Sequence, residues 1–155
     1  MICVTGTPGA GKTFLAKKLA KKLVLKYINI NNVIEEHRLS DKYDKKRKSN
    51  IVDIKKLNKA LEKIIKNNRR VIIDGHLSHY LPRKYVDLCI VVKCNLKILK
   101  NRLKKRGYSK EKIRENLDSE IFDICLSEAT ENKHKILVVD SSKKINLEEI
   151  IKKVR

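Results

Sequence analysis

The stretch MICVTGTPGAGKTFLAKKLA, residues 1–20, runs from a short apolar segment through a glycine-rich turn into a lysine-rich helical pattern. Residues 6–13 (GTPGAGKT) fit the pattern G-x-x-x-x-G-K-[ST], which binds nucleotide phosphates when it follows a strand and opens a helix. Glycines let backbone N–H groups converge on phosphate oxygens, and the positive end of the helix dipole strengthens the binding. The stretch therefore predicts a P-loop between the first strand and the first helix.

Short apolar runs alternate with helical patterns along the rest of the chain. The runs predict strands at residues 2–5, 26–30, 70–74, 87–93 and 135–139. Several of these runs are apolar throughout, which indicates strands covered on both faces of their sheet. The sequence therefore predicts an α/β fold, a three-layer sandwich with a parallel sheet between two layers of helices.

Helical patterns with a period of 3.6 residues fill the intervals between the strands. The first predicted helix carries an apolar stripe from Leu15 to Leu23, and the second runs from an N-cap at Asp53 to Ile65. A third starts at about Leu96 and stops at Gly107. Two more are predicted from about Ser109 through Ile124 and near Leu147. The chain contains no internal repeat and no linker-like tract, so residues 1–155 are expected to form one domain.

The composition favours an aliphatic core and an anionic partner. Hydrophobic residues make up 41% of the 155 residues but aromatic ones only 5%, so we expect a core of Ile, Leu and Val. The 38 Lys and Arg residues outnumber the 18 Asp and Glu residues, which gives a net charge of +20. Such a charge suits nucleotides, RNA or acidic protein surfaces, and it is equally compatible with a lysine-rich surface that serves solubility.

The cysteines and the hydropathy pattern indicate a cytoplasmic protein. Cys3, Cys89, Cys94 and Cys125 are scattered without a CxxC pair. This spacing predicts small core residues in a reducing compartment rather than a disulfide framework or a metal site. No apolar stretch approaches the roughly 18 residues that a membrane span requires.

Four residues are candidates for phosphate and metal chemistry. Lys12 is expected to neutralise the β and γ phosphates of a nucleotide, and Thr13 to ligate Mg²⁺ through its hydroxyl. The apolar run at residues 70–74 ends in Asp74, at the position where P-loop enzymes hold Mg²⁺ directly or through a water. His76 follows closely, and it either orients a water or a phosphate or is a loop histidine without a catalytic part.

Arg102 and Arg106 lie four residues apart on one face of a predicted helix. Cations over a migrating phosphoryl group accelerate its transfer by about 10³ to 10⁵. A pair of this spacing can also be solvated surface charge. Its position just before Gly107 favours a catalytic role for both arginines.

Other classes of P-loop protein are excluded by missing motifs. A GTPase would need a DxxG switch and an NKxD base-reading motif, and residues 132–135 (NKHK) lack the acid of the second. Helicases and hexameric motors need larger cores. The compact kinases remain, in which a P-loop domain binds the phosphate donor and short insertions bind the acceptor.

In combination, these elements resemble the adenylate kinase superfamily. More narrowly, the chain resembles the atypical adenylate kinase of archaea and eukaryotic nuclei, a family that also acts in maturation of the small ribosomal subunit. The likeness rests on three blocks: VTGTPGAGKT (residues 4–13), VIIDGH (71–76) and RLKKRGYSKEKIRENLDSEIFDICLSEA (102–129).

The resemblance implies a five-stranded sheet, an acceptor-binding (NMP-binding) insertion near residues 28–51 and a lid near residues 105–115. It implies ATP and Mg²⁺ as ligands, with Arg106 contacting ATP from the lid. It also implies that Asp74 and His76 form a pair linked to slow ATP hydrolysis. By the same resemblance, the ATP phosphates would be bound by Gly9, Ala10, Gly11, Lys12, Thr13 and the backbone N–H of Phe14. For the acceptor phosphate, Arg38 is only a candidate ligand.

The leading interpretation is a nucleoside monophosphate (NMP) kinase that transfers the γ-phosphate of ATP to AMP or another NMP. The alternative is an ATP-hydrolysing ribosome assembly factor whose kinase activity is incidental. The resemblance implies partners for that role, namely a ribosomal protein of the small-subunit platform and pre-ribosomal particles. The basic run at residues 45–48 suits rRNA or simply a solvated loop. A kinase for another small metabolite is a third possibility.

Overall fold

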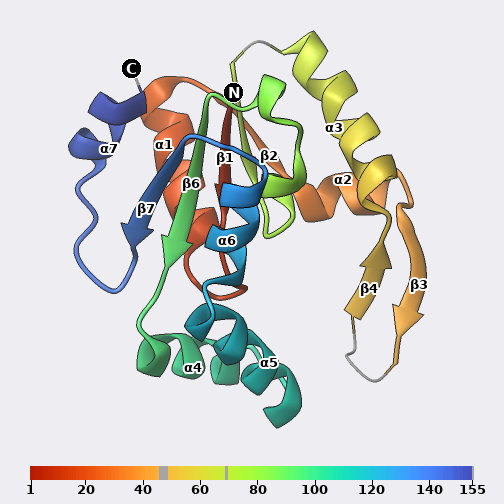
Figure 1. Cartoon of the computed structure of the whole chain (residues 1–155), viewed down its shortest axis with the longest axis vertical. Coiled ribbons are helices and arrows are strands. Elements are labelled where there is room, and N and C mark those ends of the chain that lie inside the picture. Colours follow the sequence, from red (N-terminus) through yellow and green to blue (C-terminus); the bar gives the residue numbers. More distant parts are fainter. Residues whose placement is uncertain (46–48, 69, 155) are drawn as a thin grey trace.

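Five parallel strands form the central sheet of the protein (Figure 1). The computed structural model describes residues 1–45, 49–68 and 70–154. Strand β1 (Ile2–Thr5) lies in the middle, between β5 (Val71–Asp74) and β6 (Leu88–Lys93), and the edge strands are β2 (Lys26–Asn29) and β7 (Ile136–Asp140). All five predicted strands and the predicted parallel sheet are confirmed.

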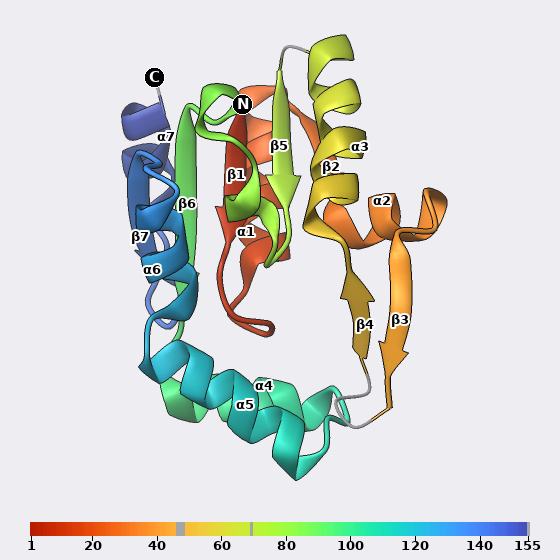
Figure 2. The same cartoon turned by 45° about the vertical axis from the view of Figure 1, so that its right-hand side comes forward.

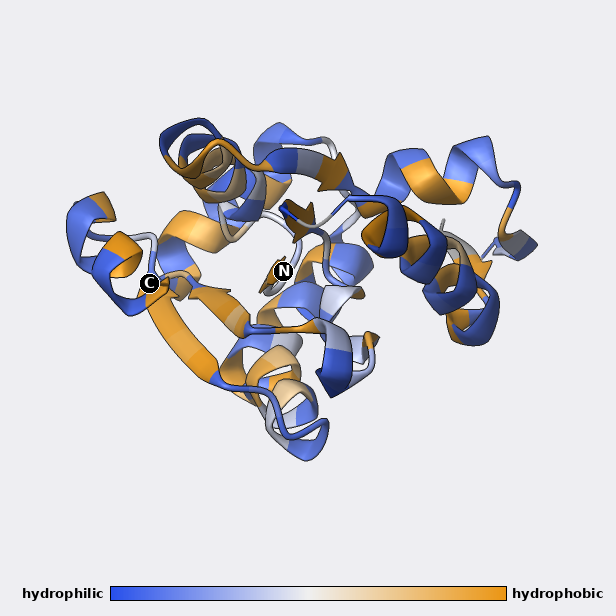
Figure 3. Cartoon of the chain, turned by 90° about the horizontal axis from the view of Figure 1, so that it is seen from above, coloured by the Kyte–Doolittle hydropathy of each residue, from blue (hydrophilic) through white to orange (hydrophobic). Residues whose placement is uncertain are grey.

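The central strands are apolar up to their last residue because successive side chains enter two different cores. In β1, Ile2 and Val4 join one cluster of buried residues, whereas Cys3 joins the other. β6 alternates in the same way, with Ile90 in the first cluster and Val91 in the second. Figure 3 shows hydrophobic residues concentrated on the sheet, while the surrounding helices alternate between hydrophobic and hydrophilic residues.

Helices cover both faces of this sheet, as the sequence predicts. Residues of α1 (Lys12–Leu23), α4 (Leu96–Lys105) and α7 (Leu147–Val154) pack into the first cluster. Residues of α2 (Ile30–Glu36), α3 (Ile54–Asn67) and α6 (Ile124–Glu131) pack into the second cluster. Two short 3₁₀ turns, η1 (Ser78–Tyr80) and η2 (Arg83–Tyr85), connect β5 to β6. The predicted N-cap is also confirmed, because the Asp53 carboxylate accepts hydrogen bonds from the backbone N–H groups of Lys55 and Lys56 in the first turn of α3.

One predicted helix is wrong in its extent. The pattern favours a single helix from Ser109 through Ile124, but α5 (Lys110–Ile121) ends before that point and α6 starts at Ile124. The break is at Asp123, whose φ of 53° is left-handed and whose carboxylate pairs with Lys93. Aspartate tolerates this conformation better than most residues do. The apolar spacing continues across the break, so periodicity alone does not reveal it.

An arm beside the sheet was not predicted as regular structure. It consists of α2 and an antiparallel hairpin of β3 (Ser40–Asp44) and β4 (Ser49–Val52). Figure 2 shows this hairpin projecting from one side of the sheet, while α4 and α5 lie beyond the carboxyl ends of β1 and β6. Of the predicted basic run at residues 45–48, residues 46–48 lie outside the described part of the chain.

Candidate active site

The P-loop connects the carboxyl end of β1 to α1, as the sequence predicts. Gly6 lies so close to β6 that a Cβ atom there would be 2.3 Å from the carbonyl oxygen of Val92. Gly11 has a φ of 100°, and α1 begins at the next residue. Only glycine allows both the close approach and the left-handed turn at low cost. The loop therefore turns directly into α1, and its backbone N–H groups lie at the N-terminus of this helix, where an anion is stabilised.

Lys12 lies across this loop. Its Nζ atom donates hydrogen bonds to the carbonyl oxygens of Gly6 at 2.8 Å and Thr7 at 3.0 Å. Burial lowers the pKa of Lys12 to about 8, and the nearby carboxylate of Asp74 opposes part of that change. The ammonium group is thus held at the mouth of the loop, where few water molecules can solvate it. A bound phosphate would compensate this loss of hydration by pairing with the positive charge.

Asp74 lies at the carboxyl end of β5, next to the P-loop, and is 1% exposed. Its Oδ2 atom accepts hydrogen bonds from Thr13 Oγ1 at 2.7 Å, Tyr27 OH at 2.7 Å and Asn29 Nδ2 at 3.3 Å. Its Oδ1 atom is buried and has no hydrogen-bond partner among the described residues. An orphaned carboxylate oxygen beside a hydroxyl group fits a hard divalent cation or a water that such a cation holds.

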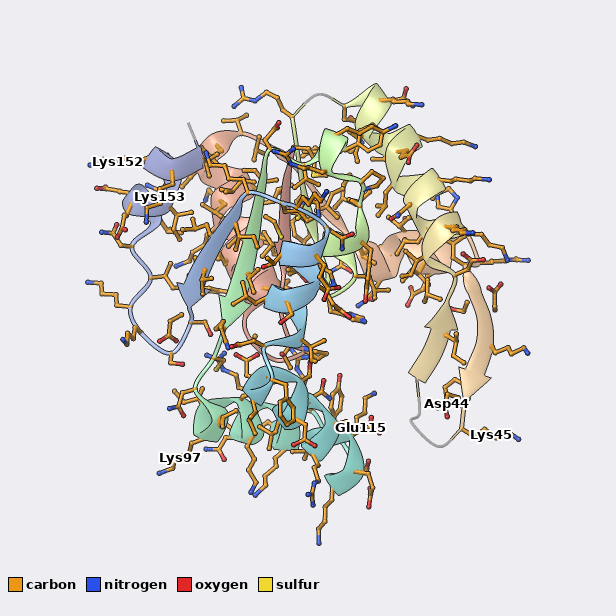
Figure 4. The ribbon with its side chains drawn as sticks, viewed as in Figure 1. Asp44, Lys45, Lys97, Glu115, Lys152 and Lys153 are labelled. Atoms are coloured by element: carbon orange, nitrogen blue, oxygen red, sulfur yellow. The ribbon has the colours of Figure 1, made fainter. Side chains whose placement is uncertain are left out.

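A pocket of about 750 Å³ opens between the P-loop, β5 and α5. Lys12, Thr13, Phe14, Asp74 and His76 line it, so the structure brings these predicted site residues together. The opposite wall comes from the segment that includes the predicted lid and is lined by Arg106, Tyr108, Lys112, Glu115 and Asn116. Figure 4 shows Glu115 on the side of α5 that faces the hairpin, whose tip carries Asp44 and Lys45.

His76 is a neutral side chain in this pocket. Its ring is open to solvent, yet the surrounding protein and the charge of Lys12 lower its pKa to about 4. At neutral pH the ring therefore has one donor and one acceptor nitrogen. His79, three residues later, is 1% exposed and is held between Thr5 Oγ1 at 2.6 Å and Glu128 Oε2 at 2.8 Å.

The two predicted arginines lie in different environments. Arg106 ends α4 and lines the large pocket. Arg102 lies behind the P-loop, where its Nη1 atom donates to the carbonyl oxygen of Gly9 at 3.2 Å and to Ser141 Oγ at 3.3 Å. Ser141 Oγ in turn donates to the carbonyl oxygen of Ala10 at 2.5 Å. In this arrangement Arg102 supports the loop backbone. It does not line the pocket between the P-loop, β5 and α5, but it does line a second cavity on the other side of the P-loop.

A second cavity of about 750 Å³ lies on the other side of Phe14 and Arg106. Its walls come from the P-loop, the start of α1, the end of α4 and the loop between β7 and α7. The two cavities share Gly9, Gly11, Phe14 and Arg106. The two cavities therefore adjoin each other at the P-loop.

Residues 2–123 match the model of a family described as "AAA domain". The chain is 37% identical over 153 residues to a protein of Methanocaldococcus jannaschii named "Putative adenylate kinase", a match that covers 99% of this chain and 82% of the relative. A protein of the same name from Pyrococcus abyssi is 40% identical over 154 residues, which cover 99% of this chain and 81% of the relative.

This chain belongs to the archaeal family of adenylate kinase-like P-loop proteins. It is accordingly a phosphotransferase with a nucleotide-binding P-loop. The solved structure of shikimate kinase from Bacteroides thetaiotaomicron superimposes with a TM-score of 0.57 at 16% identity and covers 99% of this chain and 93% of that one. At that identity the likeness concerns the P-loop kinase fold alone.

Several side chains of this kinase site were not predicted. Tyr27 and Asn29 reach Asp74 from β2, and Glu120 reaches the P-loop from α5. A signal existed for Asn29, because side chains at the carboxyl ends of neighbouring parallel strands meet at one edge of the sheet. Arg38, the sequence candidate for the acceptor phosphate, follows α2 with a φ of 49° and lines neither of the two cavities. Within the described ranges, the kinase has no helix long and apolar enough to cross a bilayer.

Proposed function

We propose that this kinase transfers the γ-phosphate of ATP reversibly to AMP or another NMP. The observation that carries the proposal is the convergence of Lys12, Asp74 and Arg106 on one pocket at the mouth of the P-loop. Cations and a metal-binding carboxylate around a phosphate cradle are what phosphoryl transfer requires.

The donor side has room for a whole nucleoside triphosphate. The P-loop would bind the phosphates with the N–H groups of residues 9–14, and the cavity beyond Phe14 would take the nucleoside. Thr13 and Asp74 would hold Mg²⁺, and the orphaned Oδ1 atom of Asp74 supports that assignment. When bound, Mg²⁺ supplies charge neutralisation between the β and γ phosphates.

The acceptor side adjoins the same pocket. A hollow of about 400 Å³ is lined by residues of α2, β4, the start of α3 and the loop after β5. It shares Asn31, His76 and Leu77 with the large pocket, so an acceptor bound there would face the donor phosphates. This hollow lies against the arm in the segment 28–51, which supports the proposed acceptor-binding insertion.

The chain's own contribution is positioning and charge. Lys12 and Arg106 would stabilise the charge on the migrating phosphoryl group, while Arg102 keeps the loop backbone in place through Gly9. Transfer between two bound nucleotides needs no covalent enzyme intermediate, and alignment of the reacting groups supplies much of the rate. The segment 105–115 would act as the lid that excludes water.

A coupled assay for ADP formation tests the proposal. Wild-type protein is incubated with Mg-ATP and each NMP in turn, and once without an acceptor. We expect acceptor-dependent ADP formation, which Lys12→Ala reduces by about a hundredfold or more because a transition-state cation is lost. Lys21→Ala, in the exposed last turn of α1, is the matched control and should retain activity. Full activity of folded Lys12→Ala protein would overturn the proposal.

We also propose a slower ATP hydrolysis at the same site. The neutral ring of His76 in the pocket favours it, because an uncharged imidazole can orient a water. His76→Ala should retain ADP formation from ATP plus AMP and lose ADP formation without acceptor. Equal loss of both activities would contradict this separate role.

The surplus of positive charge supports a further proposal, transient binding to a small-subunit ribosomal protein or to pre-ribosomal particles with their rRNA. An ATP-sensitive association with purified small subunits in co-sedimentation would support it. Absence of any association at low salt would exclude it.

A further inference from the structure

Glu120, in the last turn of α5, is a buried carboxylate that the proposed reaction does not use. It is 6% exposed. Burying an ionised carboxylate is costly unless hydrogen bonds or opposite charges compensate. The groups that compensate the buried Glu120 carboxylate therefore indicate what this side chain holds in place near the phosphate site.

Both oxygen atoms of Glu120 have partners, and these partners come from different parts of the fold. Oε2 accepts a hydrogen bond from Thr7 Oγ1 at 2.6 Å. Oε1 accepts from the backbone N–H of Cys94 at 3.0 Å, and Lys93 Nζ lies 3.9 Å from the same oxygen. Glu120 therefore joins the P-loop to the chain that leaves β6.

Thr7 accepts two hydrogen bonds from within the P-loop. Its carbonyl oxygen accepts from the backbone N–H of Ala10 at 3.0 Å and from Lys12 Nζ at 3.0 Å. Its side chain is almost completely buried, with 1% of the residue exposed, and its hydroxyl donates to Glu120. A change in the orientation of Thr7 would consequently move both the loop backbone and the ammonium group.

The same helix contributes a wall of the large pocket. Lys112, Asn116 and Ser119 of α5 line that pocket, and Glu120 is the next residue along the helix. The hydrogen bond between Thr7 and Glu120 therefore joins α5, a helix that lines the pocket, to the P-loop.

We propose that Glu120 is a positioning residue for phosphoryl transfer, acting through the Thr7 hydroxyl to fix the P-loop. The inference rests on the proposed kinase function. The carboxylate is required because two donors, the Thr7 hydroxyl and the Cys94 N–H, each need an acceptor. Glutamine has one acceptor oxygen, which can serve the Cys94 N–H, and an amide N–H₂ group that can only donate. In Glu120→Gln the Thr7 hydroxyl would therefore have to accept from the amide, and its own hydrogen would lose its acceptor.

The test compares Thr7→Val, Thr7→Ser, Glu120→Gln and the double variant Thr7→Val/Glu120→Gln. Binding of a fluorescent ATP analogue and steady-state kinetics are measured for each. Thr7→Val and Glu120→Gln should each weaken donor binding by about tenfold or more, because each disturbs a hydrogen bond to a charged group. Thr7→Ser keeps the hydroxyl and should stay within about threefold of wild type. For Thr7→Val, the KM for the acceptor should stay within about twofold of wild type, because only the donor cradle is disturbed.

The double variant distinguishes positioning through Thr7 from two independent effects. If Glu120 acts through Thr7, the double variant loses about as much donor affinity as the worse single variant. A loss equal to the product of the single losses would overturn the proposal. So would Thr7→Val protein with wild-type donor affinity and turnover.

A stability control excludes a merely structural effect. Leu61→Val, at a fully buried position of α3, should lower the melting temperature without changing donor affinity or turnover. A donor-affinity loss in Glu120→Gln that Leu61→Val reproduces at equal melting temperature would also overturn the inference. Absence of ADP formation by wild-type protein would instead refute the kinase function, and the binding measurement would still test Glu120.

Discussion

At the scale of single residues, the two oxygen atoms of Asp74 have different environments and different roles. Oδ2 is held by Thr13, Tyr27 and Asn29, so the carboxylate cannot rotate freely. Oδ1 has no partner among the described residues, although it is buried. The three hydrogen bonds fix the plane of the group and leave one oxygen for a cation or its water.

Replacing Asp74 tests this division. Asp74→Asn keeps the shape of the side chain and removes its charge, so we expect donor binding to lose most of its dependence on Mg²⁺. Titration of a fluorescent ATP analogue with and without Mg²⁺ measures the effect. Turnover should fall by about a hundredfold or more, as for loss of other charge-stabilising groups. Asp87→Asn, at the opposite end of the strands, is the matched control, and an unchanged Mg²⁺ dependence in Asp74→Asn would contradict the assignment.

At the scale of elements, the link between α4 and α5 sets the direction of the pocket wall. Gly107 follows the C-cap residue of α4, Arg106, and has a φ of 73°; Arg106 and Tyr108 on either side of it line the pocket. A Cβ atom at Gly107 would have no heavy atom within 4 Å. The conformation, and not a lack of space, is therefore the reason for glycine at this position.

The cost of that conformation can be measured. Gly107→Ala should destabilise the protein by about 1 kcal/mol, because an L-residue pays that amount in the left-handed region. Gly107→Asn should cost less, because asparagine adopts this conformation more readily. Urea denaturation of the three proteins provides the comparison. Equal stabilities for the alanine variant and wild type would show that the link can adopt another conformation.

At the scale of the whole molecule, a buried histidine connects the two layers around the site. The ring of His79 is held by Thr5 of β1 and Glu128 of α6 and also packs against the ring of Tyr80. Its backbone carbonyl oxygen lies 2.8 Å from His134 Nε2. Burial lowers the pKa of His79, although the hydrogen bond to Glu128 opposes the change. The folded protein therefore holds this ring neutral at a pH where the unfolded chain, with a pKa of about 6.5, takes up a proton.

Folding stability should consequently depend on pH. Because the unfolded chain binds more protons below pH ~6.5, the free energy of unfolding should fall as the pH decreases through that value. Urea denaturation at pH 7.5 and 5.5 measures the decline. His79→Gln is expected to be less stable at pH 7.5 and to show a smaller decline between the two pH values. An identical decline in both proteins would assign the dependence to other groups.

The sequence predicted most of the fold because its main signals are local. Continuous apolar runs marked five strands, and Asp53 and Gly107 marked helix ends through their own backbone preferences. The break at Asp123 was missed because a single left-handed residue leaves the apolar spacing intact. The hairpin of β3 and β4 was missed because β3 is polar and mostly exposed and carries little periodic signal, and because strand preference there depends on pairing with the neighbouring strand.

For the site, the sequence by itself determined the P-loop, its lysine and the carboxylate at the end of β5, because a strand, a turn and a helix in succession build that cradle locally. Only the tertiary structure decided that Arg102 supports the loop backbone and lines the second cavity, whereas Arg106 lines both cavities. A spacing of four residues on a helix does not reveal which groups each side chain contacts. The tertiary structure also brought Glu120 to Thr7 across 113 residues of chain. Contacts of that kind depend on how helices pack against a sheet, and packing is a property of the folded chain as a whole.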